Sequence, residues 1–315
     1  MSSIGELRKI AIRPRRTAGA ARGRARNPDN KAGYLFLAPW LIGLIVFTVG
    51  PMLASLYLAF TDYNLLQPPE WSGFDNIVQM FGDARLWNSL RVTLTYVFVS
   101  VPLQLALALA VAMLLDRGMR GLAFYRSVFY LPSLLGGSVA IAILWRQVFG
   151  KEGIVNGFLA WFGIEGPGWI SHPDYALATI IILHVWTFGS PMVIFLAGLR
   201  QIPEMYYEAA QMDGAGKVRR FFAITFPLLT PIIFFNLVLQ IIFAFQSFTQ
   251  AYIVSGGTGG PSDSTMFFPL YLYKEAFTEL NMGYASAMAW FLLLIIAAFT
   301  LLNFWLSKYW VFYDD

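Results

Sequence analysis

Six long stretches of the chain contain no Asp, Glu, Lys or Arg, and they constrain the fold more than any other feature. A helix that crosses a bilayer needs about 20 apolar residues, which each stretch can supply. The stretch at 221–262 is too long for one helix and ends in a Gly-rich run, so its helix is placed at 226–254. The predicted transmembrane helices are 34–60, 92–115, 127–146, 175–199, 226–254 and 282–307.

The composition agrees with a membrane protein and excludes an ordinary soluble one. The 315 residues are 57% hydrophobic and 13% charged, whereas soluble domains carry about 25% charged residues. Cysteine is absent from the sequence, so it offers no disulfide, no thiolate nucleophile and no cysteine-ligated zinc. We therefore expect an all-α polytopic membrane protein with a basic tail at 1–32 and a transmembrane domain at 33–315.

The distribution of charge predicts the orientation in the membrane. Lys and Arg are concentrated in the tail and in the second and fourth loops, whereas the alternate loops carry mostly Asp and Glu. Basic loops tend to stay in the cytoplasm, so both termini are predicted to be cytoplasmic. The basic tail at 1–32 could also be interpreted as a nucleic-acid arm. Contact with anionic lipid accounts for the same charges, and we expect no nucleic-acid partner.

Residues that could drive catalysis or ion coupling are missing from the charge-free windows. Ion-coupled carriers commonly place ionisable groups inside the membrane, but here His184 is the one titratable candidate, and a structural role is favoured for it. The segment 214–218 lacks the Ser or Thr that follows Lys in a phosphate-binding loop, so we expect no ATP hydrolysis by this chain. His172 and His184 have no third ligand nearby, and we predict no metal site.

The loop at 200–222 combines charge, small residues and glycine. Pro203 suits the first position of a helix, and Glu204 favours the positive end of the helix dipole. Gly214 or Gly216 can end that helix in a left-handed conformation. The loop therefore has two interpretations, a charged connector on the membrane surface or a docking helix for a cytoplasmic partner.

The same loop resembles the EAA signature of permeases in binding-protein-dependent ABC importers, which is E-A-A, three residues, G, nine residues and I-x-L-P. The matching residues are Glu208, Ala209, Ala210, Gly214, Ile224 and Pro227. Phe226 replaces the signature Leu, a hydrophobic exchange of little consequence. The longer run 202–215 and the block 282–287 are similar to the carbohydrate branch, and to its larger maltose-type subunit class. The large extra periplasmic domain of that subunit is absent here.

The resemblance implies a type I ABC importer permease with six transmembrane helices in a bacterial inner membrane. It implies that ATP and Mg are bound by a partner and that this chain binds no cofactor itself. The implied partners are a second permease subunit, two cytoplasmic ATPase subunits and an extracytoplasmic substrate-binding protein. The residues that it assigns to ATPase coupling are Glu208, Ala209, Ala210, Asp213 and Gly214.

Polar and aromatic residues predict a substrate pathway along the fourth and fifth helices. Five of them recur every three or four positions on the fifth helix, and so share one helical face. Polar groups are costly in lipid, and hydroxyl, amide and aromatic groups suit a sugar. Hydrogen bonding between helices is the alternative interpretation. The candidate pathway residues are Trp186, Thr187, Ser190, Asn236, Gln240, Phe243, Ser247 and Gln250.

The predicted function is therefore half of a heterodimeric permease that imports a sugar or a sugar derivative. The two alternative classes are a self-sufficient secondary carrier and an integral membrane enzyme. The missing intramembrane carboxylates argue against the carrier, and the missing catalytic motifs argue against the enzyme. The identity of the sugar stays open, although the absence of cationic side chains from the charge-free windows disfavours a pocket dedicated to anions.

Overall fold

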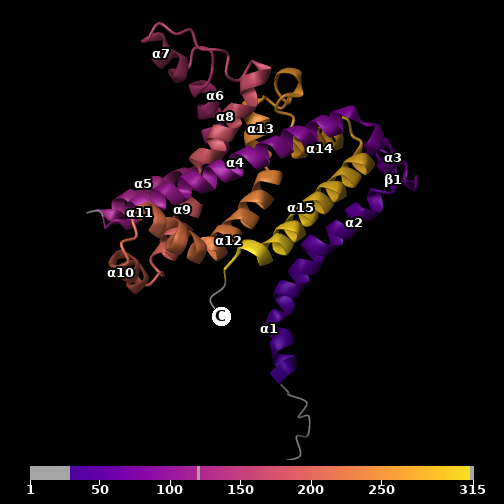
Figure 1. The fold of residues 1–315 in the computed structure, drawn as a ribbon. Coiled ribbons are helices and arrows are strands. Elements are labelled where there is room, and N and C mark those ends of the chain that lie inside the picture. Colours follow the sequence, from indigo (N-terminus) through magenta and orange to yellow (C-terminus); the bar gives the residue numbers. More distant parts are fainter. Residues whose placement is uncertain (1–28, 119–120, 313–315) are drawn as a thin grey trace, which may run out of the picture. The chain divides into compact units, whose positions relative to one another are not determined.

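The computed structural model describes residues 29–118 and 121–312, which are mainly helical (Figure 1). The chain divides into two units, one up to residue 53 and one from residue 54 onward. The predicted basic tail lies outside the described residues, except for 29–32, where the first helix already begins.

The first unit is helical and supplies the start of the first span. Its elements are α1 (Asp29–Leu44), a π-helical turn η1 (Ile45–Val49) and the beginning of α2 (Gly50–Leu58). The π turn has a local cause in Pro51, which has no N–H to donate to the carbonyl one turn earlier. The N–H of Gly50 bonds instead to the carbonyl of Ile45, which widens the turn.

The second unit contains the other elements. In chain order they are β1 (Thr61–Asp62), β2 (Glu70–Trp71), α3 (Asp75–Gly82), α4 (Ala84–Asp116), α5 (Leu122–Leu135), α6 (Val139–Val148), α7 (Ile154–Ala160), α8 (Pro173–Trp186), α9 (Gly189–Leu199), α10 (Glu204–Met212), α11 (Lys217–Arg220), η2 (Phe221–Thr225), α12 (Phe226–Phe245), α13 (Thr249–Val254), η3 (Pro261–Asp263), α14 (Phe268–Phe277) and α15 (Met282–Trp310). The two short strands pair antiparallel, with Thr61 opposite Trp71.

Within the described residues, four single helices are long and apolar enough to cross a membrane. Two bent pairs pass the same test, so the spans number six when each pair counts as one, in agreement with the sequence. The α5–α6 pair is bent by 97° and the α8–α9 pair by 41°. The predicted helices 127–146 and 175–199 are therefore each broken near the middle, by the bends between α5 and α6 and between α8 and α9.

Two other boundaries differ from the prediction. α4 begins at Ala84 rather than at 92, because the Asp83 carboxylate accepts hydrogen bonds from the N–H groups of Arg85 (2.9 Å) and Leu86 (3.1 Å) and caps the helix. The predicted helix 226–254 ends at Phe245, and α13 follows as a separate helix.

α4 is the central helix of the second unit and packs against α8, α9, α12 and α14 (Figure 1). Its buried side includes the apolar residues Leu86, Ala108 and Leu115, but also the polar residues Ser100 and Gln104. In lipid, apolar side chains gain little by meeting each other, so close packing and interhelical hydrogen bonds hold such helices together.

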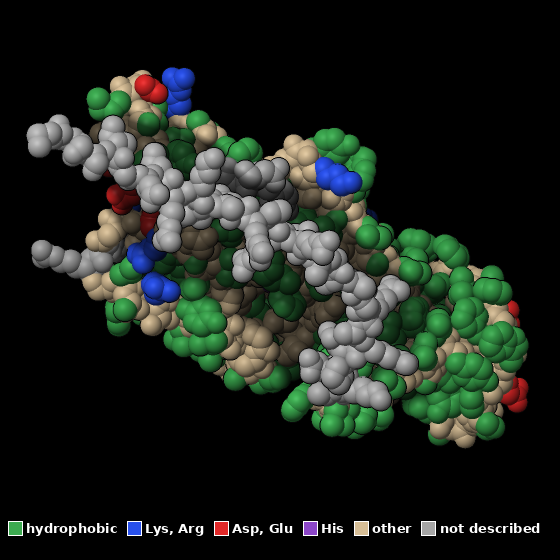
Figure 2. All heavy atoms as spheres, turned by 90° about the horizontal axis from the view of Figure 1, so that it is seen from below, with side chains coloured by type: hydrophobic (Ala, Val, Ile, Leu, Met, Phe, Trp, Pro, Cys, Tyr) green, Lys and Arg blue, Asp and Glu red, His purple; other side chains and the backbone are tan. Residues whose placement is uncertain are grey.

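The surface has the composition expected of a chain immersed in lipid. On the face seen in Figure 2, hydrophobic side chains dominate, and the few charged side chains lie near its margins. Exposed aromatic residues such as Phe98, Phe235 and Phe304 lie on the long helices. Such surfaces would aggregate in water but are compatible with a bilayer.

Candidate coupling loop and membrane pathway

α10 is the helix that the sequence predicts within the loop at 200–222. Pro203 stands one position earlier than expected, as the N-cap residue with an extended backbone (ψ 133°), and Glu204 occupies the first turn. Ile202 just before it is buried and attaches the start of the loop to the helix bundle. The local sequence therefore starts the helix with a proline that cannot donate and an acid that favours the positive dipole end.

Gly214 ends this helix in the left-handed conformation, with φ +75°. The N–H of Ala215 reaches back to the carbonyl of Ala210 at 2.9 Å, which closes the end of the helix. Gly216, the other candidate, has an ordinary φ of −68° and serves as the N-cap of α11. A side chain at position 214 would meet no atom within 4 Å, so glycine is required there for its backbone freedom and not for space.

The predicted coupling residues form an exposed surface. Glu208, Ala209, Asp213 and Gly214 are exposed, and Ala210 is half-buried. Met205 and Met212, on the same side of α10 as Ala209, are 67% and 89% exposed. A charged and apolar surface of this kind in a loop outside the spans is open to another protein.

The inner side of α10 is fixed to the long helices. The hydroxyl of Tyr207 lies 2.9 Å from Oγ1 of Thr225, the last residue of the π-helical turn that leads into α12. Pro227 explains this turn, because it cannot donate to the carbonyl of Ala223, and the Phe226 N–H bonds to Phe221 instead. The contact therefore attaches α10 to the start of α12.

A second attachment joins the loop to the central helix. Nε of Arg200, which follows α9, lies 3.6 Å from the carboxylate of Asp116 at the end of α4. Both side chains are partly exposed, so the ion pair contributes little to stability. It does hold the start of the loop, at Arg200, beside the end of α4.

The predicted stripe on the fifth helix is divided by the structure. Asn236, Gln240 and Phe243 lie in α12, whereas Ser247 lies in the turn after it and Gln250 in α13. Gln246 (φ −92°, ψ 7°) and Phe248 (φ −124°, ψ −56°) have non-helical backbone conformations, so a turn separates α12 from α13. The prediction of one continuous helical face through 250 was therefore wrong beyond Phe243.

Hydrogen bonds account for several members of the stripe. Asn236 is 1% exposed, and its Nδ2 donates to the carbonyl of Ile232 at 3.1 Å. Nε2 of Gln250 donates to the carbonyl of Gly136 at the α5–α6 break, at 3.2 Å. Phe243 is 59% exposed and Gln240 half-buried. Gln250 makes the interhelical bond that the alternative interpretation predicts, whereas Asn236 bonds within its own helix. Gln240 and Phe243 stay candidates for the pathway.

The candidates on the fourth helix lie at the break between α8 and α9. The Trp186 ring packs against that of Trp145 with 5.7 Å between centroids. Thr187 follows α8, and its hydroxyl donates to the carbonyl of His184 at 2.7 Å. Ser190 lies in the first turn of α9 and donates its backbone N–H to Oγ of Ser133, at 2.8 Å.

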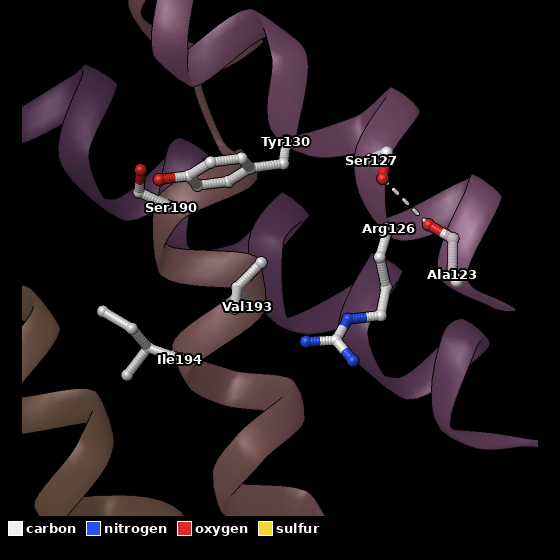
Figure 3. Close-up of a pocket in the computed structure, with 7 residues that line it drawn as sticks. All are labelled: Ala123, Arg126, Ser127, Tyr130, Ser190, Val193 and Ile194. Carbon is white, nitrogen blue, oxygen red and sulfur yellow. Dashed lines mark hydrogen bonds between the residues drawn. The ribbon is translucent and has the colours of Figure 1, made fainter.

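A cavity of about 490 Å³ opens between α5 and α9. Figure 3 shows the Tyr130 ring extending toward Ser190, with the guanidinium of Arg126 directed into the same space. Arg126 lies inside α5, because this helix begins at Leu122. Arg126 lies just before the charge-free window 127–145, so α5 brings a cation to the edge of this cavity. This placement weakens the argument against an anionic substrate.

Gln104 on α4 is not among the predicted site residues, yet it is 1% exposed and bonds directly to the α8–α9 break. A signal was present, since Gln104 is the one amide in the window 92–115. A buried amide inside an apolar helix needs partners, and neighbouring helices are where it finds them.

The N-terminal end of α4 carries a compact polar cluster around Asp83. The second carboxylate oxygen of Asp83 accepts hydrogen bonds from the hydroxyls of Tyr271 (2.7 Å) and Tyr284 (2.6 Å). Burial by itself raises the pKa of Asp83, but these phenols and the two backbone donors outweigh it and leave the pKa lowered. Burial and the same carboxylate raise the pKa of Tyr271, which stays a neutral donor.

Arg85 completes this cluster and ties it to the segment before α14. Its Nε donates to Asp263 at 2.8 Å and its Nη2 to the other carboxylate oxygen at 3.0 Å, a bidentate geometry. Among the described residues, no group of three or more His, Asp or Glu could hold a metal ion.

The fold and the exposed loop define a membrane-embedded transport subunit, and comparison with known proteins specifies its class. Residues 85–310 match the family described as the binding-protein-dependent transport system inner membrane component, and the chain belongs to this family. The match covers the spans from α4 onward and the whole loop at 200–222.

Individual relatives agree with this assignment. The chain is 54% identical to a probable ABC transporter permease protein, YesP, of Bacillus subtilis, over 93% of this chain and 96% of the relative. It is 33% identical to the lactose transport system permease protein LacF of Rhizobium radiobacter, over 88% and 94% of the two chains. A solved bacterial alginate ABC transporter, in complex with an alginate-bound periplasmic protein, shares the fold with a TM-score of 0.74 at 22% identity, over 89% of this chain and 95% of that one.

Proposed function

We propose that this chain is a permease subunit of an ATP-driven ABC importer for a sugar or a sugar derivative, in a bacterial inner membrane. The observation that carries the proposal is the exposed α10, whose Glu208-Ala209-Ala210 run ends at a left-handed Gly214 and whose inner side is bonded to the start of α12. Such a helix can receive a force from a partner and pass it to a span.

The energy then enters from a separate subunit. Two cytoplasmic ATPase subunits bind ATP and Mg, and closure of the ATPase pair moves α10. The Tyr207–Thr225 contact passes this movement to α12, and the Arg200–Asp116 pair passes it to α4. In this proposal the chain catalyses no reaction of its own.

A second permease subunit completes the pathway, and an extracytoplasmic binding protein delivers the substrate. A sugar is the proposed class because lactose permease LacF is 33% identical over most of its length. The half-buried Gln240, the exposed Phe243 and the cavity beside Ser190 supply the amide, aromatic and hydroxyl groups that suit a sugar.

The test uses the complete complex in proteoliposomes. Calorimetry on the cognate binding protein first selects the sugar, from a panel of lactose, maltotriose, sn-glycerol 3-phosphate and an alginate trisaccharide. We expect uptake of the selected sugar to need ATP inside, the binding protein outside and both permeases. Uptake by this chain alone, driven by an ion gradient, would overturn the proposal in favour of a secondary carrier.

A further inference from the structure

The break between α8 and α9 leaves backbone carbonyls without their helical donors, at the level of the pathway candidates. The carbonyl of Thr187 would accept the N–H of residue 191 in a regular helix, but residue 191 is Pro and has no N–H. In a membrane interior an unpaired carbonyl is energetically unfavourable, so other groups must bond to it.

Two side chains from other helices supply these bonds. Oγ of Ser133 on α5 donates to the Thr187 carbonyl at 2.8 Å. Nε2 of Gln104 on α4 donates to the same carbonyl at 3.1 Å, to the Thr187 hydroxyl at 3.1 Å and to the carbonyl of His184 at 3.2 Å. The amide nitrogen must face this group, because the reverse orientation would place Oε1 against two carbonyl oxygens.

The same level contains the breaks of two other helices. Gly136 at the α5–α6 bend lies so close to Thr187 that a Cβ there would overlap the threonine methyl group. The carbonyl of Gly136 accepts the bond from Gln250 of α13, just beyond the break after α12. Three broken helices are thus joined to each other, and Gln104 connects them to the continuous helix α4.

We propose that Gln104 is a positioning residue for transport, which holds the α8–α9 break in place and so sets the direction in which Trp186, Thr187 and Ser190 enter the pathway. α9 leads directly to the loop of α10, so this break separates the part of the span that the ATPase moves from the part beyond it. The inference rests on the proposed function, since it assigns a role within that transport cycle. A purely structural role predicts reduced assembly without any change in coupling.

The test replaces the amide with a side chain of similar size that cannot donate. In the reconstituted complex, we expect Gln104→Met to lower the ratio of panel sugar transported to ATP hydrolysed by about threefold to tenfold, the loss expected for two or three hydrogen bonds in a membrane. The concentration of loaded binding protein that gives half-maximal rate should stay unchanged, because Gln104 is 1% exposed and cannot contact a protein at the surface. Ser100→Ala is the matched control, as Ser100 is buried on the same helix and its hydroxyl has no partner among the described residues.

A second variant covers the case in which Gln104→Met does not assemble. Pro191→Ala supplies a backbone N–H that can donate to the Thr187 carbonyl, so the complex should assemble normally. This N–H should compete with Gln104 for the carbonyl and straighten the break. The amount of sugar transported per ATP should again fall. Wild-type coupling in Pro191→Ala, or in an assembled Gln104→Met complex, would overturn the inference. Absence of transport by the wild-type complex would instead contradict the proposed function, so the two failures are distinguishable.

Discussion

The hydroxyl of Tyr207 lies 2.9 Å from Oγ1 of Thr225, and this contact joins the exposed helix α10 to the start of the α12 span. Thr225 is buried, so the bond forms beneath α10 and not on its partner-facing surface. Tyr207 lies inside α10, and Thr225 lies just beyond the loop at 200–222, at the end of the π-helical turn η2. The contact therefore attaches α10 to the turn that leads into the α12 span.

Removal of this contact should weaken coupling and leave insertion intact. We expect Tyr207→Phe to reduce ATP-driven sugar uptake about threefold or more, because one hydrogen bond of roughly 1 kcal/mol links the moving helix to the span. Uptake in proteoliposomes at equal amounts of assembled complex is the measurement. Tyr206→Phe is the control, since Tyr206 is exposed and its hydroxyl has no hydrogen bond among the described residues. Equal uptake by both variants would count against the link.

The left-handed backbone at Gly214 predicts a contrast between two nearby glycines. Gly214→Ala forces a Cβ into φ +75° and should cost about 1 kcal/mol of helix-end stability. Gly214→Asp should abolish ATP-driven transport, since it adds a charge to the coupling surface as well. Gly216→Ala is the matched control, with the same open surroundings but φ −68°. Should the two alanine variants transport equally, the left-handed end would have no role in coupling.

Reversal of charge at Glu208 should disrupt docking of the ATPase subunit. We expect Glu208→Lys to insert normally and to lose transport and binding-protein-stimulated ATP hydrolysis, because an exposed carboxylate beside two alanines becomes a cation at the docking surface. Co-purification of the ATPase with the variant measures docking directly. Glu152→Lys makes the same charge change in the segment before α7 and should behave like the wild type. Retained co-purification and uptake in Glu208→Lys would refute the assignment of α10.

The cluster around Asp83 predicts how stability responds to pH. The pKa of Asp83 is lowered in the folded state, so its contribution is present at pH values above the ordinary value of 3.8 and is lost only as pH falls through the lower folded pKa. Asp83→Ala should cost about 1 to 2 kcal/mol by removing a helix cap. Thermal unfolding in detergent should show the same deficit at every pH from 5 to 8. A deficit that disappears between pH 8 and 5 would contradict the lowered pKa.

The absence of cysteine makes the predicted orientation easy to test. A single cysteine at Trp161, which is 84% exposed in the segment after α7, should react with a membrane-impermeant maleimide in intact spheroplasts. A single cysteine at Ser2 should react only after the membrane is opened, since the N-terminus is predicted to be cytoplasmic. The reverse pattern would invert the topology. Uptake by each variant confirms that the thiol has not disturbed the protein.

Much of the architecture could be predicted from charge-free windows, because each span needs enough apolar length and that property is local. The helix in the loop at 200–222 was predictable for the same reason, since Pro203, Glu204 and Gly214 act on the backbone of their own helix. The start of α4 at Ala84 was not, because Arg85 and Arg91 end the charge-free window although Asp83 caps the helix earlier.

By itself the sequence determined the number of spans and a glycine-terminated helix in the loop at 200–222, because these depend on apolar length and on the conformations of single residues. The coupling role of that loop is a prediction from its resemblance to the EAA signature. Only the tertiary structure decided where the helices break and which residues meet at the breaks. Pro191 removes a donor in the sequence, but whether its neighbour's carbonyl is then met by Ser133, Gln104 or nothing depends on helices far away in the chain. That choice is made by packing, and hydropathy carries no information about it.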